Sequence, residues 1–229
     1  MSVGFQDMQY VVYVDFDGTI APRDPTDGLF DRFASPNWRE IENDWHKGNR
    51  TARDCMAAQV GLLRATPDAI DDFLADVEID PKFPEFVRLC RRQGARVVVV
   101  SDGLDRVVGT VLRGAGLDLP FYANSLKWLG SDRWQLDFPH YRMDCSAGMG
   151  NCKCSHRVVN PRIQEIMVGD GRSDFCIAER SDLILAKNQL AAHCERSGLA
   201  HVRIEDFADA VMVLRGWFTE NQVSYSIAG

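Results

Sequence analysis

The chain has 229 residues, of which 45% are hydrophobic and 26% are charged, a composition typical of a globular protein with a full core. Its net charge of −7 and its pI near 5.2 argue against nucleic acid and anionic membranes as partners, since both attract basic surfaces. The charge does not exclude a small anionic substrate, because a bound metal and a local lysine can reverse the sign of a pocket.

No run of about 18 apolar residues occurs, so the sequence predicts no membrane-spanning helix. Residues 1–9 have neither a basic start nor an apolar stretch of the kind found in signal peptides. The seven cysteines are an odd number, which favours mostly reduced thiols. Together these features predict a cytoplasmic protein. A homodimer is compatible with the sequence, which does not determine the oligomeric state.

Short apolar runs rich in β-branched residues predict four buried parallel strands. Helical patterns separate them, and this alternation predicts an α/β fold with a Rossmann-like parallel sheet. Ligands of such sheets bind beyond the carboxyl ends of the strands, and the first three runs end in polar loops that contain glycine. The four runs are Tyr10–Val14, Ala95–Val100, Ile163–Val168 and Leu183–Ala186.

Two segments interrupt this alternation. Residues 22–81 carry helical periodicity without a clear strand, and we interpret them as a small helical cap domain inserted after the first strand. The Rossmann-like core then comprises residues 1–21 and 82–229. Residues 121–138 form two extended runs around Gly130-Ser131-Asp132, a pattern that predicts a β-hairpin.

Carboxylates follow the first and the third predicted strand. Asp15 and Asp17 come directly after the first, and Asp170 and Asp174 come after the third. Without a cation, buried carboxylates this close together would repel one another and lose hydration. Because Mg²⁺ prefers oxygen ligands and takes only a few from the protein, the pattern predicts a Mg²⁺ site.

Phosphoryl transfer also needs groups that hold the phosphate oxygens. Ser101, with the backbone amides of Asp102 and Gly103, provides such groups after the second strand, and Lys153 is the best candidate for a point charge. Each of these features taken alone is explained by a turn, a helix cap or a solvated lysine. Their occurrence in order at successive strand ends favours a phosphoryl-transfer site.

These residues resemble the motifs of the haloacid dehalogenase superfamily of phosphatases, over nearly the whole chain. Asp15-Phe16-Asp17-Gly18-Thr19 is similar to the first motif, and Val97-Val98-Val99-Val100-Ser101 to the second. Lys153 resembles the third motif, and Gly169-Asp170-Gly171-Arg172-Ser173-Asp174 the fourth.

The resemblance implies two in-line displacements at phosphorus. Asp15 would attack the phosphoryl group, while Asp17 would protonate the leaving oxygen and then activate a water molecule. Mg²⁺ would be held by Asp15, the backbone carbonyl of Asp17 and Asp170. Asp174 would orient a metal-bound water or Lys153.

The long helical insert is similar to the cap of the phosphoserine-phosphatase-like branch. Within that branch, three segments resemble the methionine-salvage phosphatases that act on 2-hydroxy-3-keto-5-methylthiopentenyl-1-phosphate. Cys154 stands where that family typically has a proline. The three segments are Ser101–Asp105, Asn124–His140 and Gly150–Ser155.

Phosphoserine fits this sequence less well. Asp24 could take the place of the acidic residue that grips the amino acid, but Ala57–Gln59 occupy the expected arginine position. The substrate carboxylate would then lack a bidentate partner. The implied partner is therefore a small phosphorylated metabolite, with phosphoserine, a sugar phosphate or phosphocholine as alternatives. A catalytically silent binding protein is a further alternative, which the complete set of motifs disfavours.

A group of cysteines and histidines near Lys153 in the sequence could be interpreted as a zinc site: Cys145, Cys152, Cys154 and His156, with His140 upstream. Their spacing fits no common zinc pattern, and a Cys145–Cys152 disulfide is disfavoured in a reducing compartment. The simplest interpretation is a loop of small residues that positions Lys153. Trp38 and Trp45 in the insert either line a pocket or pack in the core, and packing is favoured.

Overall fold

The computed structural model describes residues 9–145 and 148–227. A seven-stranded sheet with the order β4-β3-β2-β1-β5-β6-β7 forms the core. All neighbouring strands are parallel except β3 and β4, which form an antiparallel hairpin. The predicted α/β fold is therefore confirmed. The expectation about the N-terminus concerns residues 1–9, of which 1–8 lie outside the described residues.

The strands are β1 (Tyr10–Val14), β2 (Ala95–Leu104), β3 (Phe121–Gly130), β4 (Arg133–Asp137), β5 (Gln164–Gly169), β6 (Leu183–Ala186) and β7 (Val202–Arg203). The helices are α1 (Pro25–Phe33), α2 (Trp38–His46), α3 (Ala52–Leu62), α4 (Pro67–Ala75), α5 (Phe83–Arg92), α6 (Asp105–Gly114), α7 (Phe175–Ala178), α8 (Asn188–Ser197) and α9 (Phe207–Ile227). Two short 3₁₀ turns, η1 (Lys153–His156) and η2 (Arg172–Asp174), lie beside β5 in the sequence.

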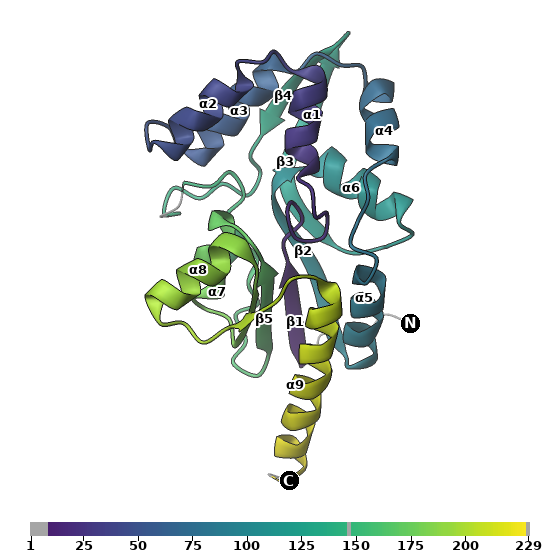
Figure 1. Cartoon of the computed structure of the whole chain (residues 1–229), viewed down its shortest axis with the longest axis vertical. Helices are drawn as coiled ribbons and strands as arrows, with labels where there is room; N and C mark the ends of the chain where they lie inside the picture. Colours follow the sequence, from purple (N-terminus) through teal and green to yellow (C-terminus); the bar gives the residue numbers. More distant parts are fainter. Residues whose placement is uncertain (1–8, 146–147, 228–229) are drawn as a thin grey trace.

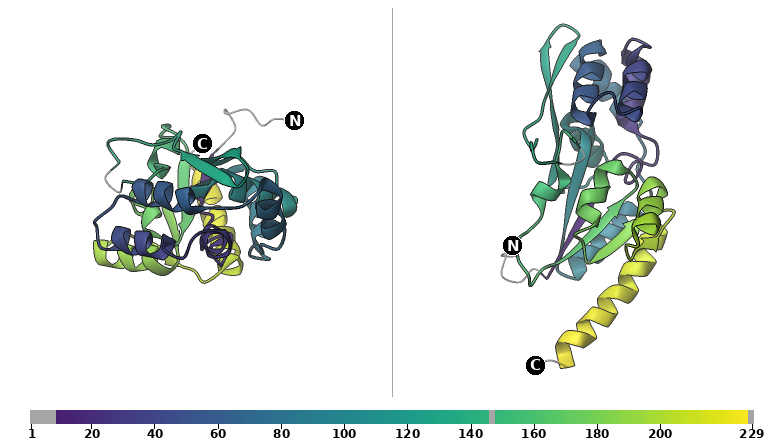
Figure 2. Two further views of the ribbon diagram at one scale, coloured as in Figure 1. Left: turned by 90° about the horizontal axis from the view of Figure 1, so that it is seen from above. Right: turned by 90° about the vertical axis from the view of Figure 1, so that its left-hand side faces the viewer.

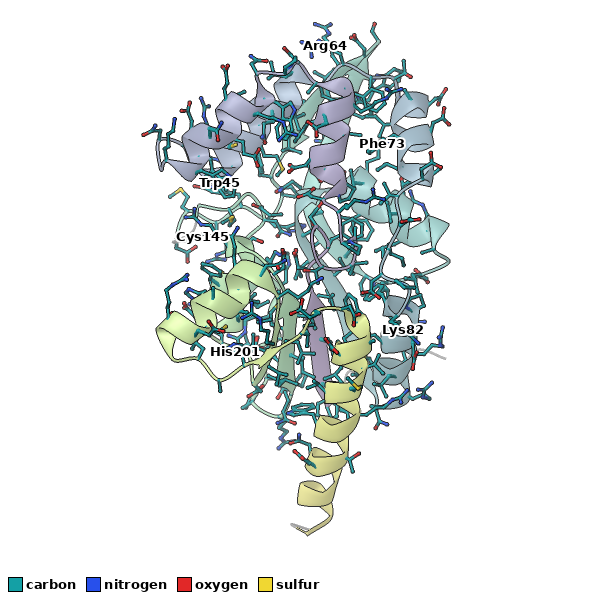
Figure 3. The ribbon with its side chains drawn as sticks, viewed as in Figure 1. Trp45, Arg64, Phe73, Lys82, Cys145 and His201 are labelled. Carbon is teal, nitrogen blue, oxygen red and sulfur yellow. The ribbon has the colours of Figure 1, made fainter. Side chains whose placement is uncertain are left out.

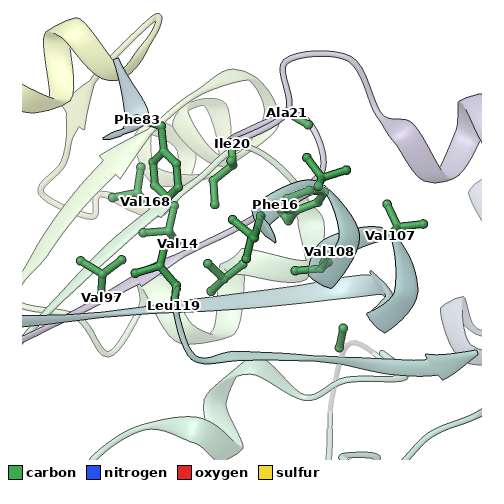
Figure 4. Close-up of a cluster of buried hydrophobic side chains, with 14 of the residues drawn as sticks. Val14, Phe16, Ile20, Ala21, Phe83, Val97, Val107, Val108, Leu119 and Val168 are labelled. Atoms are coloured by element: carbon green, nitrogen blue, oxygen red, sulfur yellow. The ribbon is translucent and has the colours of Figure 1, made fainter. Parts of the chain in front are cut away.

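The central strand β1 is buried along its whole length because the sheet has helices on both faces. Its side chains alternate between two hydrophobic clusters. Val12 and Val14 belong to the larger cluster, with α5, α6 and α9, while Val11 and Tyr13 belong to the smaller cluster, with α7 and α8. Figure 4 shows the larger cluster around Val14 and Phe16, next to the loop that follows β1. This packing fixes the position of the loop.

Helices α1–α4 lie beyond the carboxyl ends of the strands, next to the extended β3–β4 hairpin. The hairpin supports them directly: the indole Nε1 of Trp134 on β4 donates to the carbonyl of Ala65 at 2.8 Å. On the other side, Arg106 of α6 forms an ion pair with Asp71 of α4. The helical region between β1 and α5 is thus present, whereas the division into two domains at residues 22 and 81 stays a prediction.

The sequence patterns did not predict the packing of α9. The hydrophobic residues of α9 do not fall on one clear face, yet Phe218 and Trp217 pack edge-on against Tyr10. Beyond these contacts α9 extends away from the sheet (Figure 2). Among the described residues, no helix is long and apolar enough to cross a membrane.

Trp38 is 1% exposed and packs against Phe30, with ring centroids 5.6 Å apart. We expect Trp38→Ala to lower the free energy of unfolding by about 3–5 kcal/mol, because it removes a large buried ring and leaves a cavity. Urea unfolding followed by circular dichroism measures this change. A loss below about 1 kcal/mol would show that Trp38 does not anchor the helical region.

Candidate active site

The loop after β1, the last residues of β2 and the loop after β5 bring the predicted site residues together beneath the helical region. A cavity of about 480 Å³ lies here, and its other wall comes from α1, α2 and α3. Ser101, Lys153 and Asp174 are buried and do not line it, whereas the other predicted site residues do: Asp15, Asp17, Asp24, Asp102, Gly103 and Asp170. Ser101, Asp102 and Gly103 were predicted to form a loop after a strand that ends at Val100, but they lie within β2, where the pairing with β3 is irregular.

Figure 3 shows Trp45 on the side of α2 that faces the core. Its ring contacts the guanidinium of Arg172, which lies 5.6 Å from the ring centroid. Trp45 therefore lines the cavity, whereas Trp38 belongs to the packed interior.

Lys153 forms a buried bridge between two carboxylates. Its Nζ donates to Asp15 Oδ1 at 2.5 Å and to Asp174 Oδ1 at 2.6 Å. The Lys153 side chain is fully buried, and so is that of Asp174. A buried charge is tolerated only when it is paired in this way. The bridge ties the loop after β1 to η1 and η2, three segments that are distant in the sequence.

This bridge does not neutralise all the negative charge nearby. Burial and the neighbouring carboxylates of Asp170 and Asp17 raise the pKa of Asp15 to about 7, although Lys153 opposes the shift. Burial would lower the pKa of Lys153, but Asp15 and Asp174 outweigh it and raise that pKa instead. The site therefore holds an excess of negative charge around one buried cation, which favours binding of a further cation.

Asp17 points away from the lysine bridge toward the carboxyl end of β2. Its Oδ2 accepts a hydrogen bond from Ser101 Oγ at 2.9 Å, and its Oδ1 accepts one from Thr26 Oγ1 at 3.0 Å. Burial, followed by the nearby carboxylate of Asp24, raises the pKa of Asp17 to about 8. Asp15 and Asp17 thus face different partners, as expected for two residues just beyond a strand end.

Two glycines allow the loops to approach this closely. Gly18 has φ +77°, and a Cβ atom there would lie 2.6 Å from Asp170 Oδ2. A Cβ atom on Gly103 would lie 2.6 Å from Asp17 Oδ2. Any side chain at either position would push a site carboxylate aside.

Three carboxylates are grouped closely enough to hold a metal ion. Ligand atoms of Asp15, Asp170 and Asp174 lie within 4.8 Å of one another. Both oxygens of Asp174 are already engaged, Oδ1 by Lys153 and Oδ2 by the backbone amides of Asp170 and Gly171 at 3.0 Å. Asp15 and Asp170 are therefore the better direct ligands, and Asp174 positions Lys153. An all-oxygen donor set with excess negative charge fits a hard divalent cation.

The residues predicted to bind substrate also border the cavity, but each has a further contact. Asp24 Oδ1 caps α1 by accepting from the amides of Thr26 and Asp27 at 2.8 and 3.0 Å. The amide of Gly103 donates to Ser101 Oγ at 2.8 Å, which orients that hydroxyl toward Asp17. Asp102 Oδ1 accepts from the amide of Asn151 at 2.7 Å, so its carboxylate organises the neighbouring loop.

Asn151 is a buried residue whose role the sequence did not reveal. Its Nδ2 donates to the carbonyls of Ser101 at 2.7 Å and Tyr122 at 3.0 Å. Its Oδ1 lies 2.6 Å from Nε2 of His156, whose ring stacks on Tyr122. Both donors and the acceptor of the amide are thus used. Asn151 links the end of β2, which carries Ser101, to the segment that carries Lys153.

We expect Asn151→Asp to lower kcat/KM by about tenfold to a hundredfold, because a carboxylate would face two carbonyl oxygens that now accept from the amide. Steady-state phosphatase kinetics measure this effect. The same change at exposed Asn49, outside the cavity, is the matched control and should leave kcat/KM within about twofold. Unchanged kinetics for Asn151→Asp would show that the network does not support the site.

Comparison with known proteins agrees with this geometry. The family model of haloacid dehalogenase-like hydrolases matches residues 12–179. A 2-hydroxy-3-keto-5-methylthiopentenyl-1-phosphate phosphatase from Exiguobacterium sp. is 30% identical over 210 residues, covering 90% of this chain and 97% of the relative. The phosphatase of the same name from Bacillus pumilus is 30% identical over 206 residues, covering 87% of this chain and 88% of the relative.

Solved structures share the fold at lower identity. A substrate-bound phosphoserine phosphatase complex has a TM-score of 0.67 and 18% identity, covering 90% of this chain and 98% of that one. Phosphoserine phosphatase from T. onnurineus has a TM-score of 0.66 and 18% identity, covering 93% and 98%. The chain belongs to the haloacid dehalogenase-like hydrolase family and is a phosphatase of that family.

Proposed function

We propose that the protein hydrolyses a small-metabolite phosphomonoester in two steps, with Asp15 as the covalent nucleophile. The buried Asp15–Lys153–Asp174 bridge, of which Asp15 lines the cavity, is the observation that carries this proposal. It holds one oxygen of Asp15 in a fixed orientation. The Lys153 ammonium lies within hydrogen-bond distance of Asp15, the proposed nucleophile. The oxygens of a phosphoryl group must come close to this position during transfer.

In the first step, an Asp15 oxygen attacks phosphorus and the bond to the leaving oxygen breaks. Asp17 protonates that oxygen, and afterwards it removes a proton from the water molecule that cleaves the aspartyl-phosphate. Ser101 hydrogen-bonds to Asp17, and we propose that it binds a phosphoryl oxygen together with Lys153. Mg²⁺ bound at Asp15, Asp170 and the backbone carbonyl of Asp17 would neutralise charge on the transferring group.

The cavity wall supports a substrate with an uncharged, weakly polar tail. Phe30, Trp45, Cys55 and Met56 give the helical wall of the cavity apolar surface beside the carboxylates of that wall, and Met149 also lines the cavity. Within the described residues, the part of the lining contributed by positions 22–81 contains no lysine or arginine. Arg172 borders the cavity from the core side and lies over the Trp45 ring, whereas the helical wall itself offers a substrate carboxylate no bidentate partner. A thioether tail suits this wall, because sulfur packs favourably against aromatic rings.

The relatives named for 2-hydroxy-3-keto-5-methylthiopentenyl-1-phosphate act on a substrate with this combination of phosphate and methylthio tail. We therefore favour a methylthio-ketose phosphate of this class. A second candidate is phosphocholine. Asp24, Asp27 and Glu42 border the same cavity, and together with Trp45 they would suit a cationic leaving group.

A substrate panel tests both candidates. We expect kcat/KM for the methylthio-ketose phosphate to exceed the values for phosphoserine and sugar phosphates by at least about a hundredfold, the scale that a missing polar partner produces. A preference for phosphocholine would establish the second candidate, and a preference for phosphoserine would contradict both. Absence of p-nitrophenyl phosphate hydrolysis with Mg²⁺ present would instead indicate a silent binding protein.

Removal of the metal should abolish phosphatase activity. After EDTA dialysis we expect turnover to fall by at least about a hundredfold, because the clustered carboxylates would lose the cation that offsets their charge. Mg²⁺ should restore activity, whereas an equal concentration of Na⁺ at matched ionic strength should not. Full turnover in excess EDTA would rule out the proposed metal role.

A further inference from the structure

A second cavity, of about 360 Å³, lies next to the segment that carries Lys153. Four of the seven cysteines border it, and all seven are free thiols within the described residues. Three arginines and one aspartate border the same cavity, and two of the arginines are paired with carboxylates, Arg142 with Asp144 and Arg157 with Glu165; the third is Arg180. The four cysteines are Cys145, Cys152, Cys154 and Cys176.

The four thiols border one cavity, and within this group Cys145 interacts with Cys152 and Cys154 with Cys176. Across the described residues, the only three-residue group of potential ligands found within 4.8 Å is that of Asp15, Asp170 and Asp174. A thiolate zinc site requires three or four sulfurs around one point. The arrangement is therefore suited to chemistry between two thiols.

Cys154 and Cys176 lie in or next to the two segments that form the buried lysine bridge. Cys154 directly follows Lys153 in η1, and Cys176 comes two residues after Asp174, in α7. These two segments pack against each other. The two segments are also joined by the 2.6 Å contact from Lys153 Nζ to Asp174 Oδ1. The thiol pair and the ion pair therefore connect the same two segments.

We propose that Cys154 and Cys176 form a reversible disulfide when a peroxide oxidises them, and that this bond lowers phosphatase activity by displacing Lys153. The activity part of this proposal rests on the proposed function, whereas the disulfide itself does not. Both side chains are partly exposed and border the cavity, so a small oxidant can reach them.

The chemistry balances with hydrogen peroxide as the oxidant. One thiol sulfur attacks a peroxide oxygen, the O–O bond breaks, and a sulfenic acid and one water are formed. The second thiol then attacks the sulfenic sulfur, the S–O bond breaks, and the disulfide and a second water are formed. The two thiols together lose two electrons, and one hydrogen peroxide is reduced to two waters. A dithiol reductant reverses the reaction by thiol–disulfide exchange.

We expect the new bond to move the site. A disulfide brings its two sulfurs to about 2.05 Å, shorter by about 1.5–2 Å than a thiol–thiol contact. Because η1 and α7 pack against each other, we expect the segments that carry Lys153 and Asp174 to shift as the sulfurs approach. Lys153 is fully buried and held by contacts of 2.5 and 2.6 Å, so it has little freedom to compensate. Because a misplacement of about 1 Å can cost about a hundredfold in rate, we expect at least a tenfold loss of kcat.

The test begins with the reduced, Mg²⁺-loaded enzyme, whose p-nitrophenyl phosphate activity must first be established. Hydrogen peroxide is then added in graded amounts, and activity, free thiols and disulfide-linked peptides are measured on the same samples. We expect loss of two thiols, a Cys154–Cys176 crosslink in the peptide map, and a parallel loss of activity. Dithiothreitol should restore both the thiols and the activity.

Cys154→Ser and Cys176→Ser keep the size of the side chain and remove the crosslink. Each variant should retain activity under peroxide treatment that inactivates the wild-type enzyme, whereas Cys145→Ser should remain sensitive. A crosslink between Cys145 and Cys152, or no crosslink at all, would overturn the proposed site. A Cys154–Cys176 crosslink with unchanged activity would overturn the regulatory effect. Since the peptide map uses wild-type protein, these outcomes can be read even if a variant fails to fold.

Discussion

Replacing Asp15 by Asn should abolish turnover, with kcat falling by at least about a thousandfold, while the fold is retained. The amide is neutral and a poor nucleophile, so no aspartyl-phosphate can form. The substitution is nearly isosteric, and Lys153 keeps its contact with Asp174. Steady-state kinetics with p-nitrophenyl phosphate, combined with thermal unfolding, measure both parts of this prediction.

Exposed Asp72 on α4 provides the matched control for this change, because it lies outside the cavity. Asp72→Asn should leave kcat within about twofold and both variants should unfold within a few degrees of the wild type. If Asp15→Asn retained more than about a tenth of the activity, Asp15 would not be the nucleophile. A neutral side chain at this position cannot replace a carboxylate in covalent catalysis.

Replacing Asp17 by Asn should have an effect that depends on the leaving group. For an alkyl phosphate we expect kcat to fall by about a hundredfold to ten-thousandfold, because the leaving alkoxide needs a proton. For p-nitrophenyl phosphate the leaving phenolate is stable without one, so the first step should persist. Hydrolysis of the intermediate lacks its base and should slow. Stopped-flow measurement should therefore show a burst of about one p-nitrophenolate per active site, followed by slow turnover.

Thr26→Val serves as a comparison, because it removes a hydrogen bond to Asp17 but keeps the carboxylate. It should lower kcat for both substrates to a similar, modest extent, without a burst. Equal losses for Asp17→Asn with alkyl and p-nitrophenyl phosphates would contradict the general-acid role. They would point instead to a role of Asp17 in binding or folding.

The sheet could be predicted because strands buried on both faces leave continuous apolar runs that end where the chain meets polar loops. The predicted run Tyr10–Val14 has the same bounds as β1, and the hairpin around Gly130–Asp132 joins β3 to β4. The site residues followed from the same reasoning. In a parallel sheet the carboxyl ends meet at one edge, so Asp15, Ser101 and Asp170 had to lie near one another.

Contacts between segments without local signatures could not be predicted. The irregular pattern of α9 gave no sign of its packing on Tyr10, which depends on tertiary contacts. Trp38 and Trp45 are seven positions apart on one helix, yet Trp38 packs in the interior and Trp45 lines the cavity. The role of Asn151 depends on carbonyl groups of two other strands. Such roles arise from the assembled fold.

The central claim is that Asp15 carries the phosphoryl group during turnover. The most direct test is to react Asp17→Asn with p-nitrophenyl phosphate, quench with acid during the slow phase, and map the phosphorylated peptide by mass spectrometry. The two-step mechanism predicts one phosphoryl group on Asp15, in an amount equal to the burst. A burst with the phosphoryl group on another residue, or turnover without any covalent adduct, would contradict it.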